Sequence, residues 1–458
     1  MGGAALLGVT GNRTARRAAL RGAGSLLLAS ALANVAAKGL TRRPRPLLDP
    51  VPVVRRLLKQ PVTSSFPSGH SASAAAFATA LAIESPLLGA AAAPVAAAVM
   101  ASRVYTGVHY PGDVLAGAAL GAGTAALTLR WWPRRNQRPA STAAPAVDAP
   151  ALPTGEGLHI VVNGSAGSGA VPGTGTHEQI VEELRRELPD ADVRLCVEGD
   201  DLAVLLDQAA AAALKANGAL GICGGDGSVN LAATVAAGHG LPLAVFPGGT
   251  LNHFAVDLGT HTVRSTAEAV RAGSARAVDL GLAIGDDGDP HPFLNTFSIG
   301  VYPELVRVRE SLEKRLGKWP ALVVALARVL PKAQPVQLTV SGTPRSVWML
   351  FAGNGAYDPP GFAPTHRSEL DGGLLDIRAI DGSHPFARTR LLLAFLTGTL
   401  GSSPVYHEAR LSALDITGLQ EVEQFAVDGE ALPAPTRLRL TKASAALTVY
   451  RPLHPAVP

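Results

Sequence analysis

The apolar residues of this chain are concentrated before position 130, and this uneven distribution limits the folds that it can adopt. Four apolar stretches there are each about 13 to 16 residues long, short of the roughly 20 residues of a clean membrane-spanning helix. They cover residues 22–37, 71–83, 87–101 and 114–129. Flanking residues bring each stretch near the spanning length, so we predict an all-α, multi-pass membrane domain with four crossings.

Basic residues stand at both outer ends of this region. Four arginines between positions 13 and 21 precede the first stretch, and an Arg-Trp-Trp-Pro-Arg-Arg sequence at 130–135 follows the last. Four crossings place both ends on one side, and the positive-inside rule assigns that side to the cytoplasm. An alternative interpretation of residues 1–37 is a secretory signal with a cleavage site at 31–33. The abrupt start at Met1 leaves open whether a further segment precedes it.

The composition excludes one class of function and indicates a redox state. The formal net charge is +4 and aromatic residues make up 5% of the chain, which does not indicate the basic, aromatic-rich face that binds nucleic acid. The two cysteines, Cys196 and Cys223, form neither a CxxC pair nor a metal-ligand spacing. We expect reduced thiols, which favours a cytosolic second half.

The sequence pattern changes after position 133. Residues 134–157 are rich in Pro, Ala, Ser and Thr and are predicted to form a flexible linker. From 158 to 280, strand-like and helical segments alternate, a βα pattern that predicts a parallel sheet. From 281 to 458, short strands dominate and predict a mainly antiparallel β-sandwich: 335–341, 347–352, 374–380, 410–416, 424–427 and 437–440. We therefore predict a multidomain chain in which domain 1–133 precedes this linker and these two subdomains.

The first region carries an ordered set of residues suited to holding a phosphate. They are Lys38, Arg45, Ser68, Gly69 and Arg103. Lys and Arg neutralise phosphate charge, and Arg can bind two oxygens at once. Ser68 and Gly69 open the helix predicted over 71–83, and a helix N-terminus is itself an anion site.

Two imidazoles and a carboxylate accompany this set. His109 is suited to attack phosphorus, provided that a carboxylate fixes its tautomer, and Asp113 follows four residues later across a turn. His70 is the candidate acid that protonates the leaving alkoxide. Taken singly, Asp113 is also explained as a helix cap and Ser68-Gly69 as a helix start. The complete set predicts ester cleavage by way of a histidine, without metal.

The order and spacing of these residues resemble the type 2 phosphatidate phosphatase superfamily. Its signatures Lys-x6-Arg-Pro, Pro-Ser-Gly-His and Ser-Arg-x5-His-x3-Asp match segments 38–46, 67–70 and 102–113 without substitution. The resemblance implies that His109 is the nucleophile that forms a phosphohistidine, Asp113 its partner and His70 the acid. Members usually have six spanning helices, whereas four are predicted here.

A second phosphate-handling set follows in the α/β region. Gly-rich segments follow three predicted strands, at 163–169, 224–228 and 247–252. Glycines let backbone amides approach an anion closely, and helix N-termini add their dipoles. Both the GxGxxG fingerprint and the GxxxxGK[ST] loop are absent, so the phosphates must be held in another way. Taken alone, 224–228 is equally explained as a tight strand-to-helix turn.

These segments resemble the diacylglycerol kinase catalytic domain family, which includes sphingoid and related lipid kinases. Segment 224–228 resembles its Gly-Gly-Asp-Gly-Thr signature, 247–252 its Pro-x-Gly-Thr-x-Asn and 428–430 its Asp-Gly-Glu. The match covers about residues 158–455. Gly164 stands where proline is usual, and Ser228 stands where threonine is usual but keeps the hydroxyl.

This second resemblance implies a site for ATP and Mg²⁺. Asp226 would support the magnesium-nucleotide, and Glu430, or alternatively Asp428, would take the proton from a lipid hydroxyl. Asp371 lies in a segment that binds structural magnesium in some bacterial members, although an acidic Gly-Gly turn explains it equally well. The ATP-binding residues implied are Asn163, Gly224, Gly225, Asp226, Gly227, Ser228, Gly249, Thr250 and Asn252.

The two sets together predict a bifunctional enzyme of membrane lipids. The phosphatase half would need no cofactor and face outward, and the kinase half would use ATP in the cytoplasm; a secretory signal would export the kinase away from ATP. One alternative is that only the kinase half is active, as a diacylglycerol, sphingoid or polyprenol kinase beside a degenerate membrane domain. Another is a non-catalytic lipid-binding scaffold. Neither motif set identifies the lipid.

Overall fold

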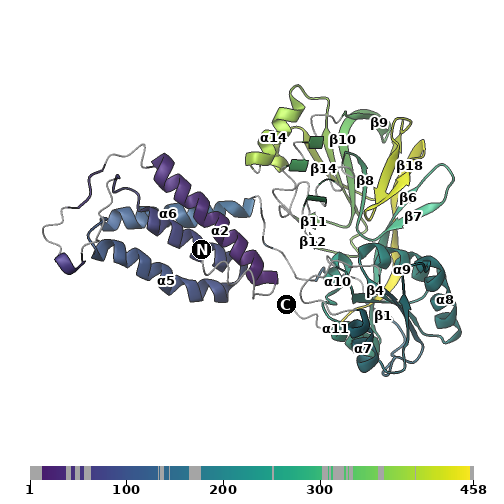
Figure 1. The fold of residues 1–458 in the computed structure, drawn as a ribbon. Helices are drawn as coiled ribbons and strands as arrows, with labels where there is room; N and C mark the ends of the chain where they lie inside the picture. Colours follow the sequence, from purple (N-terminus) through teal and green to yellow (C-terminus); the bar gives the residue numbers. More distant parts are fainter. Residues whose placement is uncertain are drawn as a thin grey trace. The chain divides into compact units, whose positions relative to one another are not determined.

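The computed structural model comprises two compact units, Met1–Arg135 and Asn136–Pro458 (Figure 1). It describes residues 13–37, 43–46, 52–55, 63–130, 132, 134, 139–143, 145–164, 177–249, 252–301, 334–358, 366–397 and 399–453, with isolated positions 308, 311, 312, 324, 325, 328 and 329. The predicted site residues Lys38 and Thr250 lie outside the described residues.

The first unit is a helical region. Its described helices are α2 (Arg13–Ala31), α4 (Gly69–Glu84), α5 (Pro86–Tyr105) and α6 (Pro111–Leu127), with shorter helical turns at Leu32–Ala37, Val53–Arg55 and Thr128–Arg130. Small residues allow close packing: Ala29 and Ala33 of the first helical segment are buried against Ala72 and Ala76 of α4. A Cβ on Gly121 would lie 2.1 Å from the Ala72 carbonyl oxygen. Small residues at helix contacts are typical of membrane bundles.

Two of the described helices are long and apolar enough to cross a membrane by length and composition. They span Pro86–Tyr105 and Pro111–Arg130. The helix α2 carries four arginines in its first half, and α4 is 16 residues long, so neither meets the same criterion. The four predicted crossings therefore stay a prediction.

The two basic clusters at the ends of the apolar region meet at the end of α4. The Glu84 carboxylate accepts from Nε of Arg17 at 2.8 Å and from Nε of Arg21 at 2.6 Å. Arg21 also donates to the Thr128 hydroxyl at 2.6 Å and to the Trp132 carbonyl. Both guanidinium groups lie over the Trp132 ring, 4.8 and 4.9 Å from its centroid. The arginines in the first half of α2 and the tryptophan that follows α6 thus share one end of this unit.

The second unit begins with the predicted α/β arrangement. Four parallel strands lie in the order β3-β2-β4-β5: β3 (Asp192–Cys196), β2 (Leu158–Asn163), β4 (Ala219–Gly224) and β5 (Leu243–Pro247). The helices are α7 (His177–Glu187), α8 (Leu202–Lys215), α9 (Asp226–His239), α10 (His253–Leu258) and α11 (Val263–Arg271). Successive β5 residues face different cores, Val245 one and Phe246 the other, as expected for a sheet covered on both faces.

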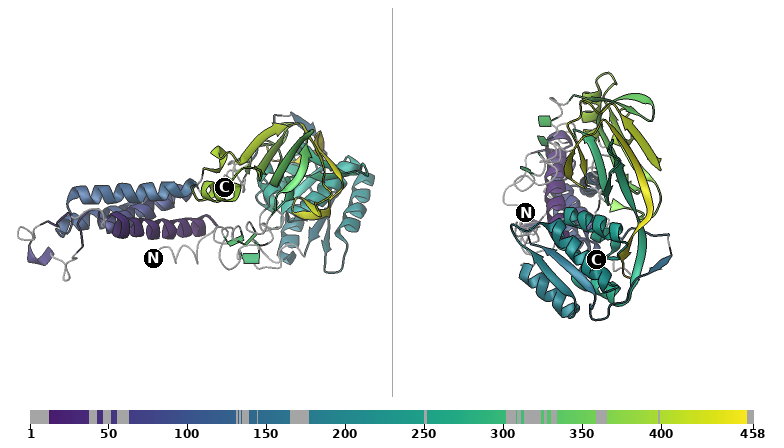
Figure 2. Two further views of the ribbon diagram at one scale, coloured as in Figure 1. Left: turned by 90° about the horizontal axis from the view of Figure 1, so that it is seen from above. Right: turned by 90° about the vertical axis from the view of Figure 1, so that its right-hand side faces the viewer.

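The rest of the unit is rich in antiparallel strands. They are β6 (Ser274–Ile284), β7 (Pro290–Phe293), β8 (Thr296–Gly300), β9 (Val336–Val340), β10 (Thr343–Asn354), β13 (Leu375–Asp381), β14 (Tyr406–Leu411), β15 (Ala413–Thr417), β16 (Gln424–Val427), β17 (Glu430–Pro433) and β18 (Arg437–Tyr450), with the separate pair β11 (Tyr357–Asp358) and β12 (His366–Arg367), the helix α14 (Ala387–Thr397) and a turn at Leu400–Ser402. Figure 2 shows β18, in yellow, reaching the α/β part, where Val449 pairs in parallel with Leu243 of β5. The result is one mixed sheet, and the sandwich arrangement stays a prediction.

Four segments differ from their predicted form. The strand predicted at 410–416 is two strands, because β14 ends at Leu411 and β15 begins at Ala413. Two strands predicted to be short are long: β10 has 12 residues and β18 has 14. The predicted linker contains the strand β1 (Ala146–Asp148), which pairs with β6. Part of the predicted linker thus forms a strand, which a composition of Pro, Ala and Ser does not indicate.

Two candidate phosphate sites

The first candidate site is built around His109, whose side chain is buried and which lies in the segment that connects α5 to α6. Its Nδ1 lies 2.7 Å from the Ser65 carbonyl oxygen. A carbonyl oxygen can only accept, so this contact places the proton on Nδ1 and the lone pair on Nε2. The Asp113 Oδ2 atom lies 3.8 Å from Nδ1, beyond hydrogen-bond distance. The hydrogen-bonding contact of Nδ1 is thus with Ser65, which no sequence motif singles out, while Asp113 lies at ion-pair distance. The role of Asp113 as the partner of His109 stays a prediction.

Asp113 holds the segments around His109 in place through hydrogen bonds to its carboxylate. Its buried carboxylate accepts from Arg43 Nη1 at 2.9 Å, from the Tyr110 amide at 3.0 Å and from the Ser65 hydroxyl. Asp113 lies in the first turn of α6, where a negative charge also favours the helix dipole. It therefore caps the helix and holds Ser65, the residue whose carbonyl contacts His109.

Hydrogen bonds to backbone carbonyls bring the three predicted phosphatase motifs together. The Ser68 amide donates to the Asp113 carbonyl oxygen at 3.0 Å, which joins the second motif to the third. Arg45 Nη1 donates to the Val108 carbonyl oxygen at 2.7 Å, and its Nε donates to the Thr63 carbonyl oxygen at 2.9 Å. In this structure Arg45 thus connects two loops beside His109.

The remaining predicted phosphate ligands occupy helix ends. Ser68 is the buried N-cap of α4, and its hydroxyl accepts from the Ser71 hydroxyl at 2.9 Å. Gly69 and His70 are the first two residues of that helix, Gly69 buried and His70 exposed. Arg103 lies in the last turn of α5, where its Nε donates to the Ser102 hydroxyl at 3.1 Å.

The contact of α6 with the start of α4 depends on Gly117. A Cβ there would lie 2.4 Å from the Ser68 carbonyl oxygen, which belongs to backbone and cannot rotate away. We expect Gly117→Ala to push α6 from the Ser68 segment, to lower stability by about 1–3 kcal/mol as overpacking does, and to reduce phosphate release more than tenfold. Phosphate release and thermal unfolding in detergent measure both effects.

The matched control is Gly123→Ala in the same helix, where an added Cβ would meet nothing within 4 Å. The added Cβ displaces no neighbour, and alanine favours a helix over glycine. We therefore expect Gly123→Ala to leave both the helix contacts and phosphate release unchanged. Equal losses in the two variants would contradict the role assigned to the Gly117 contact.

The second candidate site lies at the carboxyl edge of the parallel strands. The strands β4 and β5 end at Gly224 and Pro247, so the Gly-rich segments that follow them lie side by side. The Gly248 amide lies 3.3 Å from the Gly224 carbonyl oxygen, and a Cβ on Gly249 would lie 2.5 Å from Cα of Gly225. Ligands of open α/β sheets bind at this edge. The contact explains why glycine is needed in both loops.

Polar side chains hold these loops in shape. Asn252 adopts a left-handed conformation, with a φ of 52°, at the start of α10. Its Oδ1 accepts from the Gly249 amide at 2.7 Å, and its Nδ2 donates to the Gly249 carbonyl oxygen at 2.8 Å. From the end of β2, Asn163 Nδ2 donates to the Ser228 hydroxyl at 2.8 Å. Serine in place of threonine keeps this hydroxyl contact.

Asp226 opens α9 beside these loops. Its Oδ1 atom is buried and has no hydrogen-bond partner among the described residues. A buried polar atom without a partner is costly and calls for an explanation such as a ligand or ion. Mg²⁺ in nucleotide sites binds through one or two carboxylates together with substrate phosphates. The donor set at Asp226 therefore fits a magnesium-nucleotide.

Asp428 lies in a tight turn with an inward-facing carboxylate. The pairing of Val427 with Glu430 leaves Asp428-Gly429 as a two-residue hairpin loop, with φ values of 47° and 92°. Its carboxylate accepts from three consecutive amides, at 2.8, 2.8 and 2.6 Å, in the segment 294–296. Burial raises the pKa of Asp428 to about 6, although these hydrogen bonds favour the charged form. Glu430 is exposed at the start of β17.

A buried polar layer connects Asp428 with the α/β part. Arg367 pairs with Asp257 of α10 at 2.8 Å, from Nη2 to Oδ2, and donates to the Leu294 carbonyl. The Tyr357 hydroxyl donates to the Asn295 carbonyl oxygen at 3.1 Å. Burial raises the pKa of the Tyr357 hydroxyl, with further contributions from the charges of Asp257, Asp428 and Asp226. The sequence pattern does not predict this layer, since its residues are distant in sequence and form no motif.

Asp371 lies in the turn before β13. Nearby, the Asp279 carboxylate accepts from the Gly373 amide at 2.9 Å and pairs with Lys442 Nζ at 2.9 Å. Burial is the main cause that lowers the pKa of Lys442, while Asp279 and Asp371 oppose it. A protein cation thus lies in the field of Asp371, and its role as a metal ligand stays a prediction.

Comparison with known proteins identifies two domains. The PAP2 superfamily model matches residues 19–137, and the diacylglycerol kinase catalytic domain model matches residues 157–283. A diacylglycerol kinase of Mycobacterium tuberculosis is 29% identical over 54% of this chain and 80% of its own length. A protein named "Probable lipid kinase YegS-like", from Pseudomonas fluorescens, is 30% identical over 59% of this chain and 89% of its own length.

Among solved structures, a diacylglycerol kinase from Bacillus anthracis is 21% identical, with a TM-score of 0.45, and covers 66% of this chain and 98% of its own. The sequence matches place the PAP2 domain on the helical unit and the kinase domain on the α/β strands. The chain therefore belongs to the diacylglycerol kinase catalytic domain family of lipid kinases and carries a PAP2 superfamily domain ahead of it.

Proposed function

We propose that this chain is a bifunctional lipid-phosphate enzyme. The helical unit hydrolyses a lipid phosphate through a phosphohistidine, and the second unit phosphorylates a lipid alcohol, such as diacylglycerol, with ATP. The observation that carries the first activity is the Nδ1 contact of His109 with the Ser65 carbonyl, which orients a nucleophilic Nε2. The second rests on the glycine contact between the loops after β4 and β5, together with the inward carboxylates Asp226 and Asp428.

The phosphatase reaction follows from the His109 geometry. Nε2 attacks phosphorus, an N–P bond forms, and the P–O bond to the lipid breaks. His70 donates a proton to the leaving alkoxide, which departs as the lipid alcohol. Water then hydrolyses the phosphohistidine and releases inorganic phosphate. Lys38, Arg45, Arg103 and the start of α4 at Ser68 and Gly69 would neutralise the phosphate. The proposed reaction uses no metal.

The kinase reaction uses Asp428 as its base in our proposal. The carboxylate is held by the three amides of 294–296, and burial raises its pKa to about 6, so it is largely ionised at neutral pH. In this state it would accept the lipid hydroxyl proton. Glu430 is exposed and is the alternative base. The loops at Gly225 and Gly249 would hold the ATP phosphates. Bound Mg²⁺, held by Asp226, would neutralise phosphate charge, the main requirement of phosphoryl transfer.

The helical unit also supports a membrane topology. The basic cluster around Glu84 lies at the C-terminal end of α4, whereas Ser68 and His109 lie at its N-terminal end. A helix of 16 residues separates these ends by about 24 Å. With the basic end in the cytoplasm, as the positive-inside rule requires, the phosphatase site faces outward and the kinase domain remains where ATP is present.

The substrates are identified with purified full-length protein in mixed micelles. Labelled ATP is offered with diacylglycerol, a sphingoid base or a polyprenol, and phosphate release is followed from the matching lipid phosphates. We expect one lipid class to be phosphorylated at least about tenfold faster than the others, since a pocket fitted to one lipid discriminates by a few kcal/mol. A chain that binds these lipids but transfers no phosphate in either direction would be the non-catalytic scaffold.

A further inference from the structure

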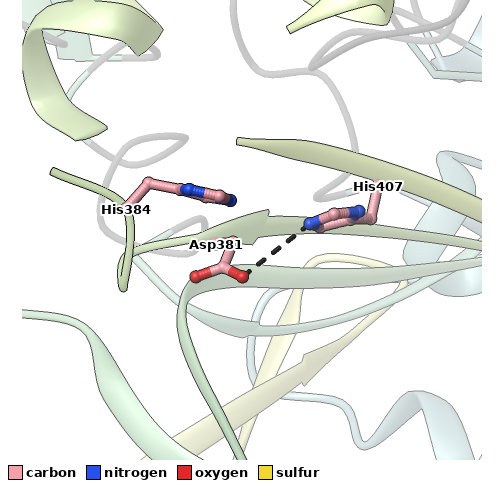
Figure 3. A group of neighbouring side chains, drawn as sticks. All are labelled: Asp381, His384 and His407. Carbon is pink, nitrogen blue, oxygen red and sulfur yellow. Dashed lines mark ion pairs between the residues drawn. The ribbon is translucent and has the colours of Figure 1, made fainter. Parts of the chain in front are cut away.

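Three side chains with metal-ligand atoms meet at the end of β13, in a part of the second unit that neither candidate site uses (Figure 3). They are Asp381, His384 and His407, and one ligand atom of each lies within 4.8 Å of the others. Figure 3 shows both imidazole rings on the same side of the Asp381 carboxylate. Among the described residues, this is the group that combines two imidazoles and a carboxylate in such proximity.

The sheet register explains why two of these residues meet. His407 of β14 pairs with Ala379 of β13, and Asp381 lies two positions further along the same strand. Side chains two residues apart share one face of a strand, so Asp381 and His407 are diagonal neighbours. The pairing continues as the Asp381 amide donates to the Val405 carbonyl oxygen at 2.8 Å.

A turn brings the third residue back to this face. The Asp381 Oδ1 atom accepts from the Ser383 amide at 2.7 Å and from the Ser383 hydroxyl at 2.5 Å. This turn places His384 above the carboxylate. The backbone carbonyl oxygen of His384 accepts from the Ala387 amide at 3.1 Å, at the start of α14. Ser383 therefore orients the carboxylate, as residues behind metal ligands commonly do.

The spacing suits a shared ion better than a direct contact. With Oδ1 bonded to Ser383, Oδ2 faces His407 Nε2 at 3.7 Å. That distance is too long for a hydrogen bond. Two ligand atoms bound tetrahedrally at about 2.0–2.2 Å from zinc lie roughly 3.3–3.6 Å apart. A small side-chain rotation would bring all three ligand atoms onto one ion.

We propose that Asp381, His384 and His407 bind one divalent transition-metal ion of the zinc type, with water in the fourth position. Two imidazole nitrogens and one carboxylate oxygen favour zinc and its neighbours over Mg²⁺ or Ca²⁺, which prefer oxygen ligands. The ion would tie the end of β13, the strand β14 and the turn before α14 together. It is separate from the proposed magnesium-nucleotide at Asp226, and its test needs neither activity.

Zinc binding to the untagged, full-length protein tests this proposal. The protein is first stripped with a chelator and desalted, then titrated calorimetrically with Zn²⁺ alone. We expect one tight site per chain in the wild type and at least about tenfold weaker binding in His384→Ala and His407→Ala, since even residues behind the ligands contribute that much. The matched control is His239→Ala, which removes an exposed histidine at the end of α9, and it should bind as the wild type does.

Thermal unfolding separates loss of the ion from loss of the fold. Zn²⁺ should raise the unfolding temperature of the wild type and of His239→Ala, because a ligand that binds only the folded state stabilises it. The same concentration of Zn²⁺ should raise the midpoints of His384→Ala and His407→Ala by less than that of the wild type, while their metal-free midpoints match the wild type. Absence of a tight site in the wild type, or equal binding by all three variants, would overturn the proposal.

Discussion

Asp428→Asn is expected to lower ATP-dependent lipid phosphorylation by about 10²–10⁴-fold, the usual contribution of a general base, and to leave phosphate release unchanged. Asparagine has nearly the same shape and keeps one oxygen toward the amides of 295 and 296, but it cannot accept the lipid hydroxyl proton. Its NH₂ group would face the Leu294 amide, which now donates to Oδ2. Some loss of stability is therefore expected as well, and unfolding is measured alongside activity.

Glu430→Gln is the matched comparison for Asp428→Asn, two residues away in the same hairpin. Glu430 is exposed, so the substitution should disturb the fold little and change lipid phosphorylation less than about threefold, as surface substitutions usually do. A reversed ranking, with Glu430→Gln inactive and Asp428→Asn active, would assign the base to Glu430 instead.

The pH profile of the kinase provides a second measurement of the same assignment. A base acts only when ionised, and burial raises the pKa of Asp428 to about 6. The kcat/KM for lipid should therefore fall as the pH drops through about 6 and reach a plateau above it, since this ratio reports the free enzyme. The residual activity of Asp428→Asn should lack this step. A wild-type profile that stays level between about pH 5 and 7 would contradict Asp428 as the base.

His109→Gln is expected to reduce phosphate release on the order of 10³-fold or more, because loss of a covalent nucleophile removes the whole pathway. Lipid phosphorylation by the same preparation should equal that of the wild type. Glutamine keeps hydrogen-bonding capacity near the Ser65 carbonyl but forms no phosphorylated intermediate. Rapid quenching with a radiolabelled lipid phosphate should trap an acid-labile phosphoprotein in the wild type and none in His109→Gln.

His70→Ala separates the acid from the nucleophile in this site. An acid matters for a poor leaving group such as an alkoxide and much less for an aryl phosphate whose phenolate leaves without protonation. The variant should therefore lose hydrolysis of lipid phosphates and keep hydrolysis of the aryl ester. Equal loss on both substrates would remove His70 from the role of acid.

The motif residues were predictable because strand and helix ends gather them. The segments at 224–228 and 247–252 each follow a predicted strand, and parallel strands end at one edge, so their meeting followed from the βα pattern. The contacts that complete each site were not predictable. Ser65 reaches His109 through its backbone carbonyl, and any residue type has a carbonyl. Arg367 and Asp257 are 110 positions apart, and no local pattern relates them.

Element lengths were also beyond the sequence pattern. The pairing of β18 shifts register between Ala443 and Leu447, and the predicted strand 437–440 covers only the residues before this irregularity. The strand continues because β6 and β5 pair with its second half. The strand β1 forms for the same reason, since β6 supplies a partner for a short segment of low apolar content.

The two proposed sites of opposite chemistry differ in their demand for metal. The most direct test is to measure both activities of one wild-type preparation in excess EDTA. We expect phosphate release from lipid phosphate to continue at its full rate while ATP-dependent lipid phosphorylation stops, and added Mg²⁺ to restore the latter. Phosphate release that stops together with the kinase, or that is absent in both conditions, would contradict this expectation.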